Sequence, residues 1–406
     1  MNYLGIDISK STARCVILDN DGEKSVKPFT LKNNKYEFNE LIERFKKHSL
    51  NSENLLIGIE ATGIWWENIY CFLTEQKFKI VVLNPHQTNK FREALRKKAK
   101  TDDIDAYVIA GLMRSNEYAQ SFVPEETVQI LKDFTKLRYR LIKDQKDYKR
   151  QALSLLALVF PEYEQTKLKK PFGIAAASIL KKFSTAKHLA QAKPKHIEKI
   201  VRSIKGNNFN IKEIIHLIQT AKDSIYSGRA ANARAINLNI MIEQVQNINK
   251  SIDELNQEIE NILSSKDDNE PFDFPGGNLL SIPGVGLKTI ASIISAVGVD
   301  AQSFKDSKKI IGYVGFYPKI YQSGETFKAN KIAKRGPAYL RSALYIAAVA
   351  CIKHNTEFRA LYQKKRSQGK AGKQALIYVA KKLAHLCLSM LKSGELYRPE
   401  RVFMPV

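Results

Sequence analysis

The N-terminal part of the chain, residues 1–123, alternates short apolar runs with polar turns, a pattern typical of a mixed α/β domain. Runs at 3–9 and 13–19 are β-rich and, with the Asn-Asp-Gly turn at 20–22, they predict a three-stranded meander. The elements expected next are a helix at 36–47, a strand at 54–60, a helix after Gly63, a strand at 78–83 and a helix from 101. We expect the basic segment 90–100 to lead into that last helix.

Helical periodicity dominates the rest of the chain. Apolar residues at spacings of three and four run from Pro124 to about Phe160, and a second seam of the same kind runs from Val245 to Ile262. Such seams predict coiled-coil packing, either as an intramolecular antiparallel hairpin or as a contact between two copies of the chain. Residues 161–235 are mostly helical and basic. Because 264–277 is polar and turn-rich, we expect domains at 1–123, 124–265 and 266–406.

Charge constrains the partners of this protein. The chain carries 65 Lys and Arg against 41 Asp and Glu, a formal net charge of +24, which indicates a polyanionic partner and favours nucleic acid. We find no apolar run of about 18 residues and no signal peptide, so we expect no membrane association and a cytoplasmic location. Four cysteines, at 15, 71, 351 and 387, lack disulfide-framework or zinc-site spacing and are expected to be reduced core residues.

Acidic residues mark three of the predicted N-terminal elements. Asp7 interrupts the apolar first strand, where an unpaired carboxylate is costly, and Glu60 ends the fourth strand. If Thr101 caps the helix that follows, Asp102 and Asp105 lie at i and i+3 on one face, while Asp103 points elsewhere. Each acid also has an ordinary explanation, at a strand end, at the start of a turn or in the first turn of a helix.

The order of three strands, helix, strand, helix, strand and helix resembles the RNase H/RuvC fold. In that fold the first and fourth strands are neighbours at the sheet centre and the last helix crosses them, which would bring together Asp7, Glu60, Asp102 and Asp105. Four convergent carboxylates repel one another unless a cation neutralises them, so this arrangement implies a hard divalent metal, most plausibly Mg²⁺. Two ions about 4 Å apart would suit phosphodiester chemistry.

Residues 280–291 have the form of a helix-hairpin-helix motif. Gly284 and Gly286 would let the turn backbone approach a phosphate, and the following helix, with Lys288 and Thr289 in its first turn, would direct its N–H groups at that anion. A structural hairpin without DNA contact is the alternative.

The segment 311–341 contains motifs that resemble those of one specific protein family. Tyr-Val-Gly-Phe-Tyr-Pro at 313–318, Gln-Ser-Gly at 322–324 and Ile-Ala-Lys-Arg-Gly at 332–336 resemble the C-terminal domain of insertion sequence 110 family transposases. Gly-Ile-Asp at 5–7, Ile-Glu-Ala-Thr-Gly at 59–63 and the Lys-Thr-Asp-x-x-Asp-Ala run at 100–106 are similar to that family's DEDD domain. DNA invertases of the Piv type share this order of domains. Departures at 316–317 and 297–300 are peripheral to the chemistry and affect only the subgroup.

The resemblance implies an N-terminal RuvC-like domain, a helical coiled-coil middle and a mainly helical C-terminal transposase domain. It implies that Ser323 is the nucleophile and forms a covalent link to DNA, with metal held by the four acids if the domains meet on the DNA. Cations close to the serine suit clamping of the scissile phosphate, although a solvated basic face is nearly as plausible; they are Lys331, Lys334, Arg335 and Arg341.

The same resemblance implies further partners. These are target and donor DNA, a structured bridge RNA that pairs with both and contacts the basic helices at about 125–235, and other copies of the chain in a dimer or tetramer. Two other classes of function are left open by the residues. A RuvC-like hydrolytic nuclease would use the acids without Ser323, and a non-enzymatic helix-hairpin-helix scaffold would need neither.

Overall fold

The computed structural model describes the chain except residues 62, 96–100, 121–122, 207–208, 265–271, 302–303, 305, 307–308, 320, 324–325, 329–331 and 404–406, and except the side chains of 321–323 and 326–328. The chain separates into two compact units, Met1–Val123 and Pro124–Val406. Within the described residues, no helix is both long and apolar enough to cross a membrane.

The first unit is built on a five-stranded sheet in the order β3-β2-β1-β4-β5. Its strands are β1 (Asn2–Ile8), β2 (Thr12–Leu18), β3 (Lys24–Lys32), β4 (Leu55–Glu60) and β5 (Lys79–Leu83). The first three form the expected antiparallel meander, whereas β4 pairs in parallel with both β1 and β5. Strands β1 and β4 are therefore neighbours at the centre, as an RNase H-like domain requires.

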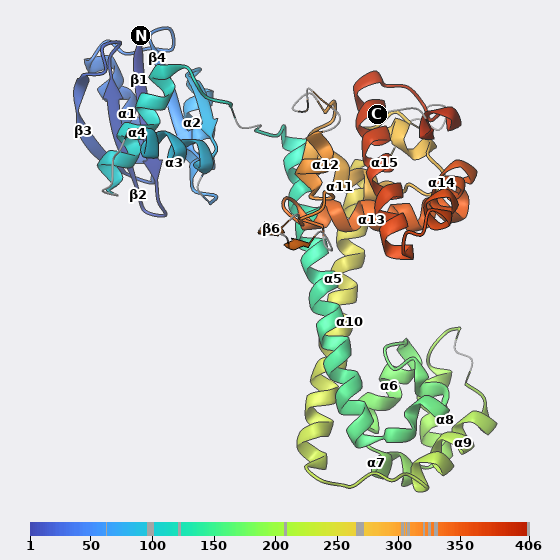
Figure 1. Cartoon of the computed structure of the whole chain (residues 1–406). Helices are drawn as coiled ribbons and strands as arrows, with labels where there is room; N and C mark the ends of the chain where they lie inside the picture. The colour runs from blue at the N-terminus through green and yellow to red at the C-terminus, as the bar shows by residue number, and fades with distance from the viewer. Residues whose placement is uncertain are drawn as a thin grey trace. The chain divides into compact units, whose positions relative to one another are not determined.

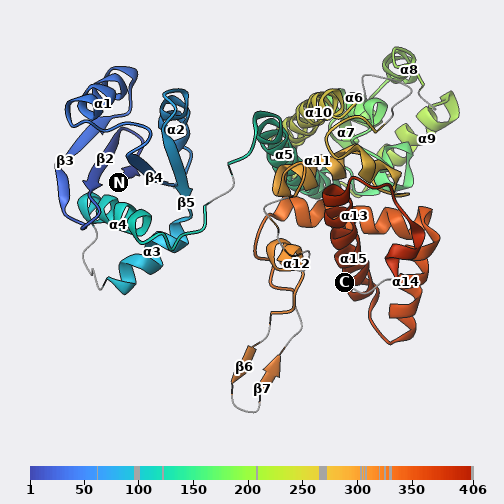
Figure 2. The same ribbon diagram turned by 90° about the horizontal axis from the view of Figure 1, so that it is seen from above.

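Helices cover both faces of this sheet (Figure 2). On one face, α1 (Lys35–Lys47) and α2 (Trp66–Glu75) pack on Leu4 and Ile6 of β1 and on Ile57 and Ile59 of β4. On the other face lie α3 (Pro85–Ala94) and α4 (Asp102–Ser115). Because side chains alternate along a strand, the residues between these apolar positions face α3 and α4.

Helix α3 corrects the predicted order of elements, which passed from the strand at 78–83 through a basic segment to the helix at 101. A local signal for this helix exists. Asn84 caps it, with its side-chain oxygen accepting a hydrogen bond from the His86 N–H at 2.9 Å, and Pro85 occupies the first helical position. The basic composition hides the helical pattern, because Thr88 is the one fully buried residue of α3.

The second unit is mainly helical and is organised by two long helices, α5 (Glu126–Val159) and α10 (Ala231–Ile262), which lie side by side (Figure 1). Arg138 Nε donates to Asn256 Oδ1 at 2.7 Å, and Gln145 bonds with Asn249 further along. Residue numbers increase along α5 in the direction in which they decrease along α10, so the two helices are antiparallel. Of the two alternatives for the seams, the structure shows the intramolecular hairpin.

Most of the remaining elements of this unit pack at the two ends of the hairpin. Between the long helices come η1 (Pro161–Gln165), η2 (Lys167–Lys169), α6 (Ile174–Lys182), α7 (Ala186–Ala190), α8 (Pro194–Arg202) and α9 (Ile211–Lys222). After them come η3 (Gly277–Ser281), α11 (Leu287–Val297), α12 (Lys309–Val314), β6 (Tyr321–Ser323), β7 (Thr326–Lys328), α13 (Ala338–His354), α14 (Thr356–Ser367), α15 (Gly372–Ser393) and η4 (Pro399–Val402).

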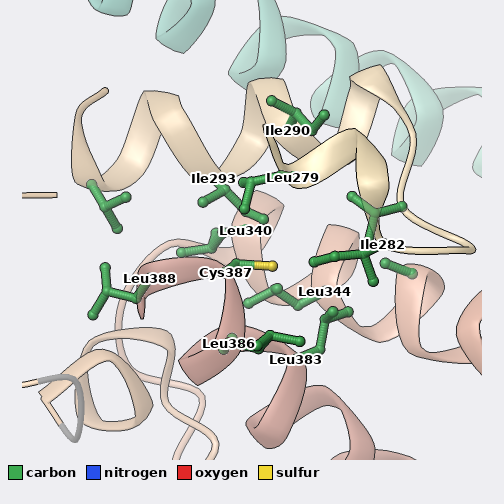
Figure 3. Close-up of a cluster of buried hydrophobic side chains, with 14 of the residues drawn as sticks. Leu279, Ile282, Ile290, Ile293, Leu340, Leu344, Leu383, Leu386, Cys387 and Leu388 are labelled. Carbon is green, nitrogen blue, oxygen red and sulfur yellow. The ribbon is translucent and has the colours of Figure 1, made fainter. Parts of the chain in front are cut away.

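Two hydrophobic cores follow from this arrangement. One joins the adjacent ends of α5 and α10 to α6–α9, and the other joins the opposite ends of the hairpin to α11–α15. In the second core, Ile293 of α11 lies on the side of Leu340 of α13 (Figure 3), and both line one small cavity with Cys387 and Leu388 of α15. The regions that we distinguish at 124–265 and 266–406 thus share one compact unit, because Val128 and Ile259 belong to the C-terminal core.

The cysteines divide differently from our expectation. Cys15, Cys351 and Cys387 are buried, and burial raises the pKa of Cys15 and of Cys351 to about 12. Cys71 on α2 is exposed, so its prediction as a core residue is wrong. Its side chain lies on the outer side of a helix whose buried positions are Ile69 and Leu73.

Candidate active site

The two strand acids meet through the parallel ladder at the sheet centre. The register between β1 and β4 pairs Gly5 with Gly58 and Ile6 with Ile59, so the next two residues, Asp7 and Glu60, follow side by side. Both carboxylates are partly buried and lie on the face opposite Ile6 and Ile59, toward α3 and α4.

Two glycines bring α4 down onto that face. A Cβ atom at Gly5 would lie 2.1 Å from the Ala106 carbonyl oxygen and 2.5 Å from the Ala110 nitrogen. A Cβ at Gly58 would lie 2.6 Å from Met113 Cγ. Helix α4 therefore crosses β1 in backbone contact and packs its Ile109 and Met113 side chains on β4, so packing explains the positions of these glycines.

The first turn of α4 carries the other two candidate acids. Thr101 caps the helix as predicted, its hydroxyl oxygen accepting from the Ile104 N–H at 3.3 Å. Asp102 is exposed and Asp105 is partly buried, and both stand within one turn of Ala106, which rests on Gly5.

Asp103 has a different partner from Asp105. It makes an ion pair with Arg14 of β2, and this bond holds the pKa of the Asp103 carboxyl below its usual range. Arg14 is itself the ladder partner of Asp7.

Three residues that our sequence analysis did not single out contact the acids. The hydroxyl of Thr88 on α3 donates to Glu60 Oε2, and Arg92, one turn later, donates to Asp105 Oδ1 at 3.2 Å. Arg14 is the third. No local pattern predicts these contacts, because they join residues 13 to 89 positions apart in the chain.

The donor set fits a divalent cation in its chemistry. All four acids offer carboxylate oxygens, which Mg²⁺ and similar hard cations prefer, and the ladder register sets two of them, Asp7 and Glu60, side by side on the face that α4 crosses. Across the part of the chain that the structure describes, no three His, Cys, Asp or Glu side chains are already grouped so that they could hold a metal ion. A cation site on these acids therefore requires side-chain movement that brings at least three of them together.

The C-terminal candidate, Ser323, is the last residue of β6 and is paired in register with Thr326 of β7. Figure 2 shows these two strands as an antiparallel pair. The side chain of Ser323 and the whole of Lys331 lie outside the described residues. Lys334 and Arg335 are exposed.

Arg341 is engaged with the protein's own backbone. Its Nη1 donates to the carbonyl oxygens of Val314 at 2.9 Å and of Arg335 at 3.3 Å. This nitrogen holds the loop before α13, so a phosphate contact by Arg341 would have to come from the rest of the guanidinium.

The turn before α11 connects a short 3₁₀ helix, η3, to an α-helix. Gly284 has φ +100°, and a Cβ there would lie 2.7 Å from the Cys351 nitrogen of α13. Gly286 caps α11, and a Cβ there would meet nothing within 4 Å. Packing thus explains Gly284, whereas Gly286 faces open space.

Comparison with known proteins adds to this geometry. Residues 4–161 match a DEDD transposase family model, and residues 277–363 match the model of the IS116/IS110/IS902 transposase family. The chain belongs to the IS110 transposase family. Membership in this family makes the protein a DNA transposase or recombinase, and its DEDD domain indicates dependence on a divalent metal in general.

Some of the relatives align along nearly the whole chain. The pilin gene-inverting protein of Moraxella bovis is 24% identical over 395 residues, which cover 97% of this chain and 96% of the relative. The IS900 42 kDa protein of Mycobacterium paratuberculosis is 22% identical over 404 residues, covering 98% and 97%. The IS110 43.6 kDa protein of Streptomyces coelicolor is 31% identical over 119 residues, 29% of each chain.

A groove in the second unit of this IS110 family protein adjoins the α11 N-terminus. It has a volume of about 760 Å³ and lies between α5, α10, α11 and α13. Gly286, Lys288 and Thr289 line it, together with cationic side chains of α5, namely Arg138, Lys143 and Lys146. Lys288 is paired with Glu260 at 3.3 Å. The groove therefore joins the predicted phosphate-binding turn to basic residues of the long helix.

Proposed function

We propose that this IS110 family protein is the transposase of an insertion sequence and cuts and rejoins DNA through Asp7, Glu60, Asp102 and Asp105 with Ser323. The observation that carries the proposal is the β1–β4 register, which sets Asp7 beside Glu60 on the face that α4 crosses. Such a position for two carboxylates is costly unless they are used, since charged groups at a sheet centre need compensation.

A divalent cation held by these acids, with Mg²⁺ the proposed ion and two ions possible, would supply positive charge at the reacting phosphate. The chemical step belongs to Ser323. Its Oγ forms a bond to phosphorus, the bond from phosphorus to one strand oxygen breaks, and the serine proton ends on that departing oxygen as a hydroxyl. Attack by a hydroxyl end of another strand reverses the step and releases the serine. Because the phosphodiester is conserved, rejoining needs no ATP.

The basic character of the protein supports nucleic acid partners. A net charge of +24 suits the holding of DNA and RNA together, and the groove at the α11 N-terminus gathers several of these cations. We propose that a bridge RNA supplies the base pairing with target and donor DNA, while the protein contacts backbone and shape. Assembly of two or four copies belongs to the same proposal.

A denaturing gel tests this function. Labelled target DNA is incubated with the wild-type protein, Ser323→Ala or the control Thr326→Ala, each with Mg²⁺ and the RNA transcribed from the element's noncoding end. Thr326 is the ladder partner of Ser323 and offers a hydroxyl on the same pair of strands. We expect a shifted, protease-sensitive band with the wild type and with Thr326→Ala, and none with Ser323→Ala.

The rival nuclease function predicts another outcome. If the wild type gives no covalent band while Ser323→Ala still releases free cut ends, water is the nucleophile and the recombinase proposal is wrong. A protein that binds DNA but yields neither a covalent band nor cut ends in this assay would point to the scaffold alternative.

Site-specific inversion is the second candidate, favoured by the near full-length alignment with the pilin gene-inverting protein. The two recombination outcomes differ in their DNA junctions. Plasmids carrying the element with its flanks are recovered after expression of the protein and sequenced across both boundaries. Insertion at new sites supports transposition, whereas reversal of an internal segment at fixed sites supports inversion.

A further inference from the structure

One face of α3 contacts two of the four candidate metal ligands. Thr88 and Arg92 are four residues apart and so lie on the same face of the helix. Thr88, whose exposed fraction is only 4%, donates its hydroxyl to Glu60 of β4. Arg92 donates to Asp105 of α4, and both of these side chains are about one fifth exposed, at 22% and 21%.

The α3 helix is itself fixed relative to these acids. Gln87 exchanges two hydrogen bonds with the backbone of Ala119, each of 2.8 Å, which ties α3 to the segment that follows α4. The guanidinium of Arg92 is also anchored, because its Nη2 donates to Asn89 Oδ1 at 2.8 Å while Nη1 reaches Asp105. A planar guanidinium that is hydrogen-bonded through both of its terminal nitrogens fixes the position of the carboxylate that it binds.

We propose that the Thr88–Arg92 face of α3 is the positioning element of the carboxylate site, fixing Glu60 and Asp105 for a divalent cation. Partners of this kind orient metal ligands and set the affinity of the site, and losing one costs about 10–100-fold in metal affinity. This inference rests on the proposed function, because it takes Glu60 and Asp105 as ligands. Thr88 and Arg92 are positioning residues, since they act through the carboxylates.

The first test removes one hydrogen bond without changing shape. Mn²⁺ alone is titrated into the full-length protein, free Mn²⁺ is followed by electron paramagnetic resonance, and wild type is compared with Thr88→Val and Thr88→Ser. We expect Thr88→Val to weaken Mn²⁺ binding by about 10-fold. Thr88→Ser keeps the hydroxyl and should bind as the wild type does. Thr88→Ala replaces Thr88→Val if the buried valine prevents folding.

The second test replaces the guanidinium of Arg92 while keeping a positive charge at that position. Arg92→Lys retains a cation but cannot bond Asn89 and Asp105 with a rigid plane, so Mn²⁺ affinity should fall severalfold. Lys90→Arg is the matched control. Lys90 lies on the same helix but pairs with Glu93 at 2.9 Å, with both side chains about two thirds exposed. Its substitution should leave Mn²⁺ binding unchanged.

A kinetic readout separates positioning from simple loss of folding. In strand cleavage, Thr88→Val should raise the Mg²⁺ concentration needed for half-maximal rate by about 10-fold, with the rate at saturating Mg²⁺ within about twofold of wild type. A lower rate at every Mg²⁺ concentration, with an unchanged half-maximal concentration, would overturn the positioning role.

Glu60→Gln distinguishes failure of this inference from failure of the proposed function. If Glu60→Gln abolishes Mn²⁺ binding while Thr88→Val and Arg92→Lys bind as the wild type does, α3 is only structural and the inference is wrong. If Glu60→Gln binds Mn²⁺ normally, or if the wild type itself binds none, the carboxylate site fails and the inference falls with it.

Discussion

Arg14 of β2 and Asp103 of α4 form an ion pair between the sheet and the first turn of the helix that crosses it. Arg14 is also the ladder partner of Asp7, so a guanidinium bonded to Asp103 stands beside one of the four proposed metal ligands. Asp103 thus has a structural partner that ties α4 to β2, whereas Asp105 pairs with Arg92 of α3.

Asp103→Asn should therefore leave strand cleavage within a fewfold of wild type and cost little stability. The Asp103 side chain is 58% exposed, and exposed ion pairs contribute less than about 1 kcal/mol. Since Arg14 lowers the pKa of Asp103 in the folded protein, this contribution is full above the unfolded pKa of about 4 and is lost as the pH falls through the folded value. Thermal melts at pH 7 and at about pH 3 measure it, and the difference between wild type and Asp103→Asn should shrink at the lower pH.

The four proposed ligands should behave differently from Asp103. We expect Asp7→Asn, Glu60→Gln, Asp102→Asn and Asp105→Asn each to reduce strand cleavage by more than about 100-fold, the upper cost of losing an outer partner of a metal ligand. Binding of nucleic acid should persist, because each change removes negative charge and leaves the basic contacts intact. Cleavage gels and filter binding on the same preparations make the comparison. Recombination near the wild-type level in Asp7→Asn or Asp102→Asn would contradict the assignment of these acids to a metal site.

The sheet and the acids were predictable because their signals are local. Alternating apolar runs predict β1 to β5. Asp7 and Glu60 can be recognised as candidates because they are charged residues within or at the end of apolar strands. Thr101 is followed by three aspartates within four residues, which is the pattern of a helix N-terminus. The structure confirms Thr101 as the N-cap of α4. Element order then suffices to expect β1 beside β4 with α4 across them.

What the sequence analysis missed depends on distant contacts or on weak patterns. Helix α3 has an Asn-Pro start signal but almost no apolar stripe, so the sequence analysis did not predict it. Thr88 and Arg92, which contact Glu60 and Asp105, were missed for the same reason. The long seams did not reveal whether α5 would pair within the chain or between chains, since both arrangements bury the same stripe. The hydrogen bond between Arg138 and Asn256 decides for pairing within the chain.

The charge of the protein predicts steep dependence of binding on salt. Affinity for DNA should fall log-linearly with salt, and Lys334→Ala or Arg335→Ala should weaken binding to all sequences alike and reduce the slope by about one each, because both side chains are exposed. Arg341→Ala serves as the contrast. Its Nη1 bonds backbone carbonyls, so its loss should lower thermal stability with a smaller change in slope. Affinity that is flat between low and physiological salt would contradict the polyanion interpretation.

The two glycines of the turn before α11 separate a packing role from a phosphate-binding role. Gly284→Ala places a Cβ at a positive φ and against the backbone of α13, so it should destabilise the protein by about 2 kcal/mol or more. Gly286→Ala places a methyl group in open space in the groove that Arg138, Lys143 and Lys146 also line, with φ −120°, which any residue adopts. Its folding should be unaffected.

DNA affinity then decides what the turn does. If the backbone at 286 approaches a phosphate, the methyl group of Gly286→Ala should weaken binding severalfold while the melting temperature stays at the wild-type value, since the added atom stands where the anion would sit. Lys288→Ala gives an independent measure, because it removes a cation beside the same helix start without altering the turn. Equal DNA affinity for wild type, Gly286→Ala and Lys288→Ala would mean that the hairpin is structural and that Gly284 serves only the close approach to α13.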